Sequence, residues 1–290
     1  MVRQLRRGEK LALQIILVAI VLFAGFMTAM LMWLSRDLPS MARLEMIEPS
    51  LKTRILAADS SVIREYYKQD RILLNIGAIP RDVQQTFLAI EDRRFYSHFG
   101  IDFYRIASAA LKDIRHWEIR EGASTITMQL ATDLFFTKEQ TWTRKIKEAL
   151  LALRIERTYS KDEILEMYLN QIYIGGGGYG IEAASNRFFG TSVDSLKLHQ
   201  IALLAGLQKN PSGYNPFRMP ERALKRRDIC LRMLRDFGVI EQSQLDTLRI
   251  KPLDVVPRER GDADFAGYFT EHIRQILAQK YGDQAIYRGG

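Results

Sequence analysis

One glutamate stands where the surrounding sequence can tune a carboxyl group for proton transfer. Glu91 follows Phe87 and Leu88 by four and three residues, so on a helix its carboxylate shares their apolar face. Burial on that face and the negative end of the helix dipole would both raise the pKa of this carboxyl group. The structural alternative is an ordinary helix-end acid that pairs with Arg93 or Arg94.

A second glutamate has the opposite surroundings. Glu148 follows Arg144 and Lys145 by four and three residues, and two neighbouring cations favour its ionised form. Local spacing alone favours a surface ion pair on a helix, worth about 0.3 to 0.5 kcal/mol. Two carboxyl groups held in opposed environments are nevertheless what divided acid and base roles require.

A small, hydroxyl-rich segment precedes an apolar helix, with the sequence Gly122-Ala123-Ser124-Thr125-Ile126-Thr127-Met128-Gln129. A serine or threonine here can cap the helix and leave backbone N–H groups for an anion. With Arg144, Lys145 and Lys209, the segment could form a phosphate site if the fold brings them together. The simpler interpretation is N-capping alone.

Other patterns exclude common ligand sites. The glycine run at residues 175–180 follows a predicted helix and lacks Gly-Lys-Ser/Thr, so it is no P-loop. A flexible connector, or a close backbone approach to a ligand, fits it better. The four histidines form no H-E-x-x-H pair and no C-x-x-C is present, which argues against structural zinc. The single cysteine, Cys230, excludes an intrachain disulfide.

The residues with chemical potential follow a long apolar segment. Leu11 to Leu34 carries no charge, and its 24 residues would span roughly 36 Å as a helix, enough to cross a bilayer. A signal peptide would have a shorter core and a small-residue cleavage site. We therefore predict an uncleaved transmembrane helix at 11–34, with the basic residues 1–10 in the cytoplasm and everything after Ser35 outside. Residues 35–53, with Pro39 and Pro49, form the predicted connector.

The remainder is predicted to be mainly α. A chain of 290 residues, 47% hydrophobic and 26% charged, predicts one or two domains with a sizeable core, and excludes collagen-like and disordered classes. The net charge of +8 suggests anionic partners, although charge alone favours a solvated surface. Short β-leaning runs lie between Thr53 and Leu74, with a turn at residues 59–61. Helical patterns then cover Val83 to Ile90, Arg144 to Glu156, a helix opened by the Ser160–Glu163 capping box, Ile181 to Phe189, Leu196 to Leu207, Pro220 to Phe237 and Asp264 to Tyr281.

Five segments, in order, resemble the peptidoglycan glycosyltransferases (glycosyltransferase family 51), found in class A penicillin-binding proteins and monofunctional transglycosylases. They span roughly Arg54 to Arg235. The segments are Glu91-Asp92-x-x-Phe95-x-x-His98-x-Gly100, Gly122-x-Ser124-Thr125-Ile126-Thr127-x-Gln129, Arg144-Lys145-x-x-Glu148, Ile164-Leu165-Glu166-x-Tyr168-Leu169-Asn170, and Ala202-Leu203-Leu204-Ala205-Gly206 leading to Tyr214-Asn215-Pro216.

The resemblance implies a lysozyme-like glycosyltransferase domain at 54–250, with a smaller membrane-associated lobe whose apolar surface Phe135, Phe136 and Trp142 would supply. It implies a single-pass protein of the bacterial inner membrane with its catalytic domain on the periplasmic side. There it would polymerise lipid II into β-1,4-linked glycan with inversion. Lipid II and the growing strand are the expected partners, together with the membrane and other wall-synthesis proteins.

The resemblance also implies roles for individual residues. Glu91 would be the general base, and Glu148 would assist the pyrophosphate leaving group, with a divalent cation (Mg²⁺ or Mn²⁺) and no organic cofactor. The implied substrate-binding residues are Asp92, His98, Ser124, Thr125, Gln129, Arg144, Lys145, Asn170 and Lys209.

Two features depart from the family pattern. Met128 stands where a first glutamine is usual, and Thr132-Asp133 replaces a common Lys-Asn pair, which removes a phosphate contact. Residues 251–290 resemble the segment that leads to a transpeptidase domain. No Ser-x-x-Lys motif is followed by Ser-x-Asn and Lys-Thr-Gly, so no transpeptidase activity is expected.

Three alternatives compete with the glycosyltransferase. A lysozyme-like glycan hydrolase would also use carboxylates, but the Arg144-Lys145 pair and the anchor favour a lipid pyrophosphate donor. A non-catalytic scaffold of wall synthesis is disfavoured by the presence of both Glu91 and Glu148. A nucleic-acid partner is not expected, because no reading motif accompanies the basic charge.

Overall fold

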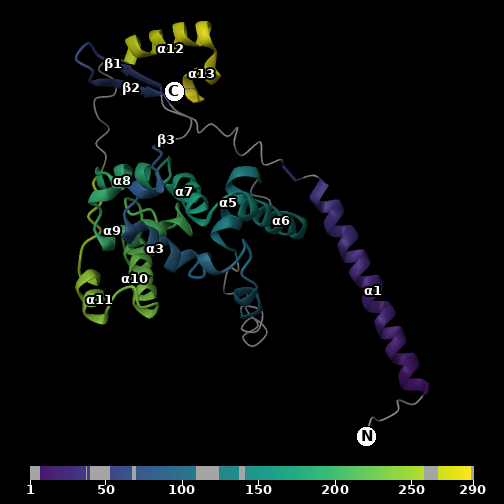
Figure 1. The fold of residues 1–290 in the computed structure, drawn as a ribbon. Coiled ribbons are helices and arrows are strands. Elements are labelled where there is room, and N and C mark those ends of the chain that lie inside the picture. The colour runs from purple at the N-terminus through teal and green to yellow at the C-terminus, as the bar shows by residue number, and fades with distance from the viewer. Residues whose placement is uncertain are drawn as a thin grey trace.

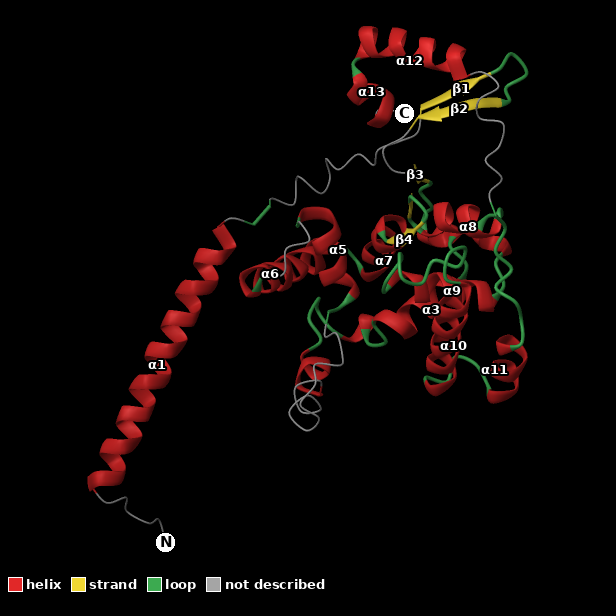
Figure 2. Ribbon diagram, turned by 180° about the vertical axis from the view of Figure 1, so that it is seen from behind, coloured by secondary structure: helices red, strands yellow, loops and turns green. Residues whose placement is uncertain are grey.

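Three parts make up the chain, namely a long N-terminal helix, a helical body, and a small unit of two strands and two helices (Figure 1). The computed structural model describes residues 7–36, 38–39, 53–66, 70–108, 124–136, 141–257 and 267–288. Helices dominate the described residues, and strands form a small part of them, as the view from behind shows (Figure 2). The predicted mainly α class is confirmed.

The N-terminal helix α1 (Arg7–Arg36) contains the predicted 11–34 segment and extends two residues beyond it. Its stretch Gln14–Arg36 has a mean hydropathy of 2.7 and is a candidate membrane span. Along this stretch most large apolar side chains are exposed, which suits a lipid environment. The helix ends against the body, where Leu34 is buried and Arg154 donates to the Ser35 carbonyl at 3.2 Å. Most of the predicted connector, residues 40–52, lies outside the described residues.

The helical body is built around one nearly all-buried helix. Helix α9 (Leu198–Gln208) is mostly apolar around its circumference, and residues 199–207 are buried. A helix with that pattern must be surrounded by other elements. Its neighbours include α3, α8, α10 and α11. The body helices are α3 (Arg81–Glu91), α5 (Ile126–Phe135), α6 (Trp142–Thr158), α7 (Lys161–Gln171), α8 (Ile181–Phe189), α9, α10 (Pro220–Asp236) and α11 (Gln242–Arg249), with short turns η1 (Ile76–Ala78), η2 (Phe95–Ser97) and η3 (Val193–Ser195); residues 103–108 are also helical.

Side-chain caps fix where several helices begin. The predicted capping box of α7 is present, because Ser160 accepts from the Glu163 backbone and the Glu163 carboxylate accepts from the Ser160 backbone. Thr125 caps α5 by accepting from the Met128 N–H, as the hydroxyl-rich segment predicted. Residues 122 and 123 of that segment lie outside the described residues. Helix α8 has the predicted limits, whereas α6 starts two residues earlier, α9 ends one residue later and α11 was not predicted.

The glycine run forms an ordered hairpin rather than a flexible connector. Strand β4 (Tyr173–Gly175) turns through positive φ at residues 175–177 and pairs antiparallel with β5 (Gly178–Tyr179). Strand β3 (Asp70–Arg71) lies parallel to β5. The predicted β-leaning run at residues 72–74 is not a strand; β3 lies directly before it. At the end of the run, a Cβ on Gly180 would lie 2.7 Å from the Asn170 carbonyl oxygen, so the hairpin packs tightly on the end of α7.

The small unit joins residues from the two ends of the body. Strands β1 (Thr53–Leu56) and β2 (Val62–Tyr66) form the predicted antiparallel hairpin, with Ser60 at φ 67° in its turn. Helices α12 (Gly267–Tyr281) and α13 (Asp283–Arg288) pack on it, and the Tyr66 hydroxyl donates to the Thr270 carbonyl at 2.6 Å. The predicted limits, 54–250 and 251–290, divide segments that pack together. Helix α13 was not predicted.

Two aromatic residues have a different environment from the expected one. Phe135 and Phe136 are partly buried and pack against the core, so they do not form an exposed apolar surface. Of the three expected residues only Trp142 is largely exposed, at 88%. Phe135 ends α5 and Phe136 caps it, so both follow the last turn of a helix whose apolar face packs inward.

A buried arginine holds the segment after α11 onto the body. Arg227 is fully buried in α10 and donates to the carbonyls of Arg249, Lys251 and Pro252 at 2.9, 2.5 and 3.1 Å. These bonds satisfy carbonyl groups that follow the last turn of α11. Asp228 pairs with the guanidinium at 2.8 Å and balances its charge.

Replacing Arg227 by methionine should lower the free energy of unfolding by about 3 kcal/mol, because three carbonyl groups lose a charged donor. Thermal unfolding of the detergent-solubilised chain measures this. Arg235→Met is the matched control on the same helix, since Arg235 pairs only with partly exposed groups. Equal losses for the two variants would contradict the structural role of Arg227.

Candidate active site

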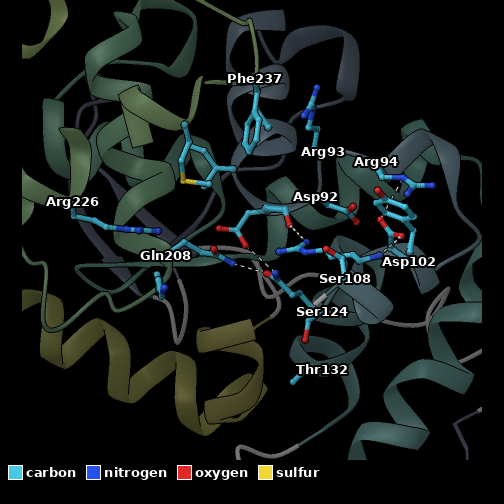
Figure 3. Close-up of a pocket in the computed structure, with 18 residues that line it drawn as sticks. Asp92, Arg93, Arg94, Asp102, Ser108, Ser124, Thr132, Gln208, Arg226 and Phe237 are labelled. Carbon is cyan, nitrogen blue, oxygen red and sulfur yellow. Dashed lines mark hydrogen bonds and ion pairs between the residues drawn. The ribbon is translucent and has the colours of Figure 1, made fainter. Parts of the chain in front are cut away.

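A cavity of about 1030 Å³ opens where α3, α5, α9 and α10 converge (Figure 3). Three carboxyl groups line it, from Glu91, Asp92 and Asp102. Five cationic side chains also line it, so cations outnumber carboxyl groups: they are Arg93, Arg94, Arg105, Lys209 and Arg226. A cavity with an excess of cations and a few carboxyl groups suits a negatively charged ligand.

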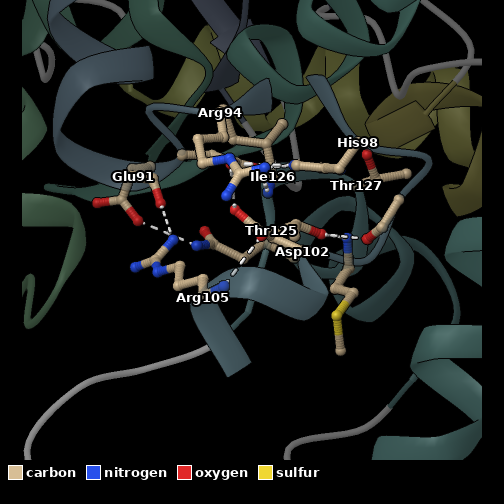
Figure 4. Close-up of polar contacts among 12 residues, drawn as sticks. Glu91, Arg94, His98, Asp102, Arg105, Thr125, Ile126 and Thr127 are labelled. Carbon is tan, nitrogen blue, oxygen red and sulfur yellow. Dashed lines mark hydrogen bonds and ion pairs between the residues drawn. The ribbon is translucent and has the colours of Figure 1, made fainter. Parts of the chain in front are cut away.

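Glu91 is the last residue of α3, as predicted, and its carboxylate lies at the cavity wall. Gln129 from α5 donates to Glu91 Oε2 at 3.0 Å, and Arg105 donates to the Glu91 carbonyl at 2.7 Å (Figure 4). Burial raises the pKa of the Glu91 carboxyl group above its ordinary value. The Gln129 hydrogen bond and the charges of Arg226, Arg105 and Lys209 oppose this rise. The direction agrees with the sequence prediction, and Arg93 and Arg94 do not supply the partner.

Asp92 connects the end of α3 to the start of α5. Its carboxylate lies 3.0 Å from His98 Nε2 and accepts from the Ile126 N–H at 3.0 Å. Both Asp92 and His98 are buried. Thr125 adds a second link, since its hydroxyl donates to the Gly100 carbonyl at 2.5 Å. These contacts tie the segment that follows Glu91 to the start of the helix that carries Gln129, and Figure 4 shows Thr125, Ile126 and His98 gathered there.

Glu148 is buried, which corrects the local interpretation of a surface ion pair. One oxygen lies 3.0 Å from Arg144 Nη1, and the other lies 3.0 Å from Lys145 Nζ. Lys145 also donates to the Ser124 hydroxyl at 2.5 Å, and Ser124 lines the cavity. Burial of a carboxylate with two cations follows the rule that buried charges are paired. The group of Arg144, Lys145 and Glu148 therefore lies behind Ser124 and reaches the cavity through it.

The predicted substrate-binding residues fall into two groups. Five of the residues that the sequence predicted for the site are found in the cavity lining, namely Glu91, Asp92, Ser124, Gln129 and Lys209. The others lie outside the lining and make structural contacts. Asn170, for example, is buried and its amide exchanges two hydrogen bonds with the Leu74 backbone, at 3.0 and 2.8 Å. A backbone contact of this kind positions β3 and η1 rather than a ligand.

The departures from the family pattern have different surroundings. Met128 is buried, lies outside the cavity lining and gives its N–H to the Thr125 cap. Thr132 lines the cavity, where its hydroxyl donates to the Met128 carbonyl. The lysine that Thr132 replaces would have lined the cavity, so its loss affects ligand contacts there. Met128 instead affects the packing of the interior behind the cavity wall.

Several residues of the site escaped the sequence analysis. Gln208, the last residue of α9, has its amide 2.6 Å from Glu91 Oε1, and Tyr168 lies beside it at 3.0 Å. Arg226 donates to the Gly206 carbonyl at 3.1 Å and faces the same cavity. The only local signal for Gln208 is its place directly before Lys209. Its contact with Glu91 joins residues that are far apart in the sequence.

The residues around Glu148 do not fit the divalent cation that the family resemblance implied. Each Glu148 oxygen lies 3.0 Å from a cationic nitrogen, and these two positive charges oppose a divalent cation there, even though Oε1 is buried without a hydrogen-bond partner. No group of three or more His, Cys, Asp or Glu side chains in the described part of the chain is arranged to hold a metal ion. A divalent cation prefers several oxygen ligands.

The transglycosylase family model matches residues 59–235, more than half of the chain, and the chain belongs to this family. Penicillin-binding protein 1A of Aquifex aeolicus is 42% identical over 281 residues, covering 97% of this chain and 38% of the relative. Penicillin-binding protein 1A of Escherichia coli is 39% identical over 270 residues, covering 93% and 32%. The family expected from the five motifs is thus confirmed, and the chain spans less than two fifths of these relatives.

A solved structure has a related fold. The crystal structure of penicillin-binding protein 1A from Haemophilus influenzae matches with a TM-score of 0.51 at 24% identity. The match covers 84% of this chain and 26% of that one. This similarity supports the fold alone.

Replacing Asp92 by alanine should lower the free energy of unfolding by about 3 kcal/mol, because His98 and the Ile126 N–H lose a buried charged acceptor. Hydrogen exchange of the Ile126 amide should accelerate strongly. Asp82→Ala, in the exposed first turn of the same helix, should leave that amide protected. Unchanged exchange at Ile126 in Asp92→Ala would show that Asp92 does not hold α5.

Proposed function

We propose that this chain is a membrane-anchored peptidoglycan glycosyltransferase that polymerises lipid II. The observation that carries the proposal is a partly buried carboxyl group, Glu91, in a cavity with excess positive charge. Membership of the transglycosylase family supports glycosyl transfer. The choice of lipid II rests on the resemblance of the five motifs and on the cationic lining, which suits a pyrophosphate.

Glu91 is the proposed general base. Its carboxylate takes the proton from the 4-hydroxyl of the acceptor sugar as that oxygen attacks the anomeric carbon of the donor. The bond from this carbon to the pyrophosphate oxygen breaks, and undecaprenyl pyrophosphate leaves with the bonding electrons. A single displacement inverts the anomeric carbon and gives a β-1,4 linkage. A carboxyl group whose pKa is raised by burial is a stronger base than an exposed glutamate.

Cationic side chains are the proposed stabilisers of the leaving group. Lys209 and Arg226 line the cavity and can offset the charge that develops on the pyrophosphate. Lys145 reaches the lining through Ser124, while Glu148 holds Arg144 and Lys145 in place. Glu148 acts in this proposal by orienting cations.

The contacts of the other carboxyl groups favour transfer over hydrolysis. A glycosidase needs a second carboxyl group that is free to act beside the first. Asp92 is engaged by His98 and Ile126, and Glu148 by two cations. Asp102 accepts from the Arg105 N–H at 3.0 Å and lies 3.7 Å from Arg94. Glu91 is the lining carboxyl group whose main contacts come from neutral amides.

The proposed topology places the body next to its lipid substrate. Helix α1 would cross the inner membrane with its basic N-terminus in the cytoplasm, by the positive-inside rule. Trp33 suits the outer interface. Phe99 and Phe103 are 80% and 72% exposed, and they offer the body apolar contact with the bilayer.

Glu91→Gln should abolish polymerisation, a loss of at least about 100-fold, while lipid II binding persists, because the substitution removes the base and keeps the shape. Gel separation of glycan made from labelled lipid II measures the rate, and binding is measured in the same detergent. Shortening of added glycan strands by the unsubstituted protein would indicate a hydrolase. Binding without polymerisation by the unsubstituted protein would indicate a scaffold.

Lys209→Met should weaken donor binding about tenfold, because one charge-assisted contact to the pyrophosphate is lost. Lys225→Met is the matched control, since Lys225 is exposed on α10 and outside the cavity lining. A donor affinity equal in both variants would contradict the placement of the pyrophosphate at Lys209. Titration with labelled lipid II provides both affinities.

A further inference from the structure

Three side chains form a closed ring of polar contacts at the cavity wall. Gln129 Nε2 lies 3.0 Å from Glu91 Oε2, and Gln129 Oε1 lies 2.7 Å from one end of the Gln208 amide. The other end of the Gln208 amide lies 2.6 Å from Glu91 Oε1, which closes the ring. All three distances are within hydrogen-bond range, so each contact needs one proton between its two atoms.

The number of protons in this ring depends on Glu91. A side-chain amide presents one donor end and one acceptor end, so the two glutamines supply two protons for three contacts. An ionised carboxylate supplies none, and one contact then sets two oxygens against each other whichever way the amides turn. A protonated Glu91 supplies the third proton. In that state Glu91 Oε1 donates to Gln208, Gln208 donates to Gln129, and Gln129 donates to Glu91 Oε2.

Tyr168 adds one donor but does not remove the deficit. Its hydroxyl lies 3.3 Å from Gln129 Oε1 and 3.0 Å from the Gln208 amide. Burial raises the pKa of Tyr168 well above its ordinary value, so the hydroxyl stays protonated. With Glu91 ionised and Gln208 turned, the Gln208 and Gln129 oxygens face each other at 2.7 Å, and one hydroxyl proton cannot occupy both contacts.

We propose that Gln208 is a positioning residue that closes this ring and retains a proton on Glu91 until the acceptor substrate opens it. The inference rests on the proposed function for the base role of Glu91. When the acceptor hydroxyl displaces Gln208, the Glu91 proton passes to cavity water, and the carboxylate then accepts the hydroxyl proton. Gln208 thereby links ionisation of the base to arrival of the sugar that it must deprotonate.

The charges around Glu91 are arranged for such release. Arg226 from α10, Lys209 after α9 and Arg105 from residues 103–108 all favour its ionised form. Cys230, also on α10, remains a neutral thiol, because burial raises its pKa to about 11. Burial, followed by the negative charges of Glu91, Asp133 and Asp92, raises the pKa of Tyr168 and keeps its hydroxyl protonated. The closed ring therefore favours protonated Glu91, whereas the three cations favour the ionised form. When the ring opens, the effect of the cations remains and the carboxylate ionises.

Protein stability as a function of pH tests the ring without any reaction. The Glu91 carboxyl group has a raised pKa in the folded chain, against an ordinary value of 4.5. Its proton therefore stabilises the fold below pH 4.5, and this contribution is lost as pH rises through the folded pKa. Melting temperatures of the detergent-solubilised full chain are measured from pH 4 to 8 for the unsubstituted protein, Gln208→Ala, Gln84→Ala and Glu91→Gln.

Gln208→Ala should have a lower melting temperature than the unsubstituted protein at pH 4, and this difference in melting temperature should narrow as pH rises. Gln84→Ala is the matched control, because the Gln84 amide donates only to the Ile76 and Ile79 carbonyls, and its difference in melting temperature should stay constant. Glu91→Gln should gain relative stability as pH rises. A pH-independent difference for Gln208→Ala, or no pH effect of Glu91→Gln, would overturn the proposal. Gln208→Asn, whose amide is one methylene shorter, replaces Gln208→Ala should the latter not fold.

The rate of polymerisation supplies an independent reading. In the pH profile of kcat/KM, the acidic limb should move to lower pH by about one unit in Gln208→Ala, because the loss of one hydrogen bond changes a pKa by about that much. The limb should not move in Gln84→Ala. An unmoved limb in Gln208→Ala contradicts the ring. Absence of polymerisation by the unsubstituted protein would remove the proposed function, while the melting curves would still decide whether Gln208 retains the proton.

Discussion

The geometry of the site depends on the contacts that the Asp92 carboxylate makes. This carboxylate is buried, pairs with His98 and accepts from the first backbone N–H of α5. Glu91 lies directly before Asp92, and Gln129 lies one helical turn after the Thr125 cap. One buried acceptor therefore sets the distance between a carboxyl group on α3 and an amide on α5. Buried charged acceptors are costly to leave without donors, so the arrangement is stable once formed.

A second constraint comes from the close approach of α9 and α10. A Cβ on Gly206 would lie 3.1 Å from Arg226 Cγ and 3.2 Å from the Cys230 sulfur, so a larger residue would require these two side chains to shift. The close approach lets Arg226 bond the Gly206 carbonyl while it faces the cavity. Gln208 and Lys209 follow within one turn. The position of Arg226 in the cationic wall of the cavity is thus set in part by a small residue in a buried helix.

Short sequence patterns predicted the features of the structure that depend on contacts between residues close together in the sequence. The capping box at Ser160, the Thr125 cap, the hairpin turn at residues 59–61 and the position of Glu91 at a helix end all follow from neighbours within four residues. The burial of Glu148 does not, because Arg144 and Lys145 predict the same ion pair on a surface as in an interior. Gln208 was missed for the same reason: its partners Glu91, Gln129 and Tyr168 are brought together by tertiary packing. The family motifs supplied the long-range information for Glu91 and Gln129, and no motif supplied it for Gln208.

The pairing of β1 and β2 with α12 and α13 has a mechanical consequence. Residues 53–66, which precede the body in the sequence, contact residues 267–288, which follow it. A pull applied to α13 is carried to the hairpin through the contacts of Tyr66 with Thr270 and Tyr287. The load path bypasses α3, α5 and α9. Tension between α13 and the hairpin is therefore carried outside the helices that line the cavity.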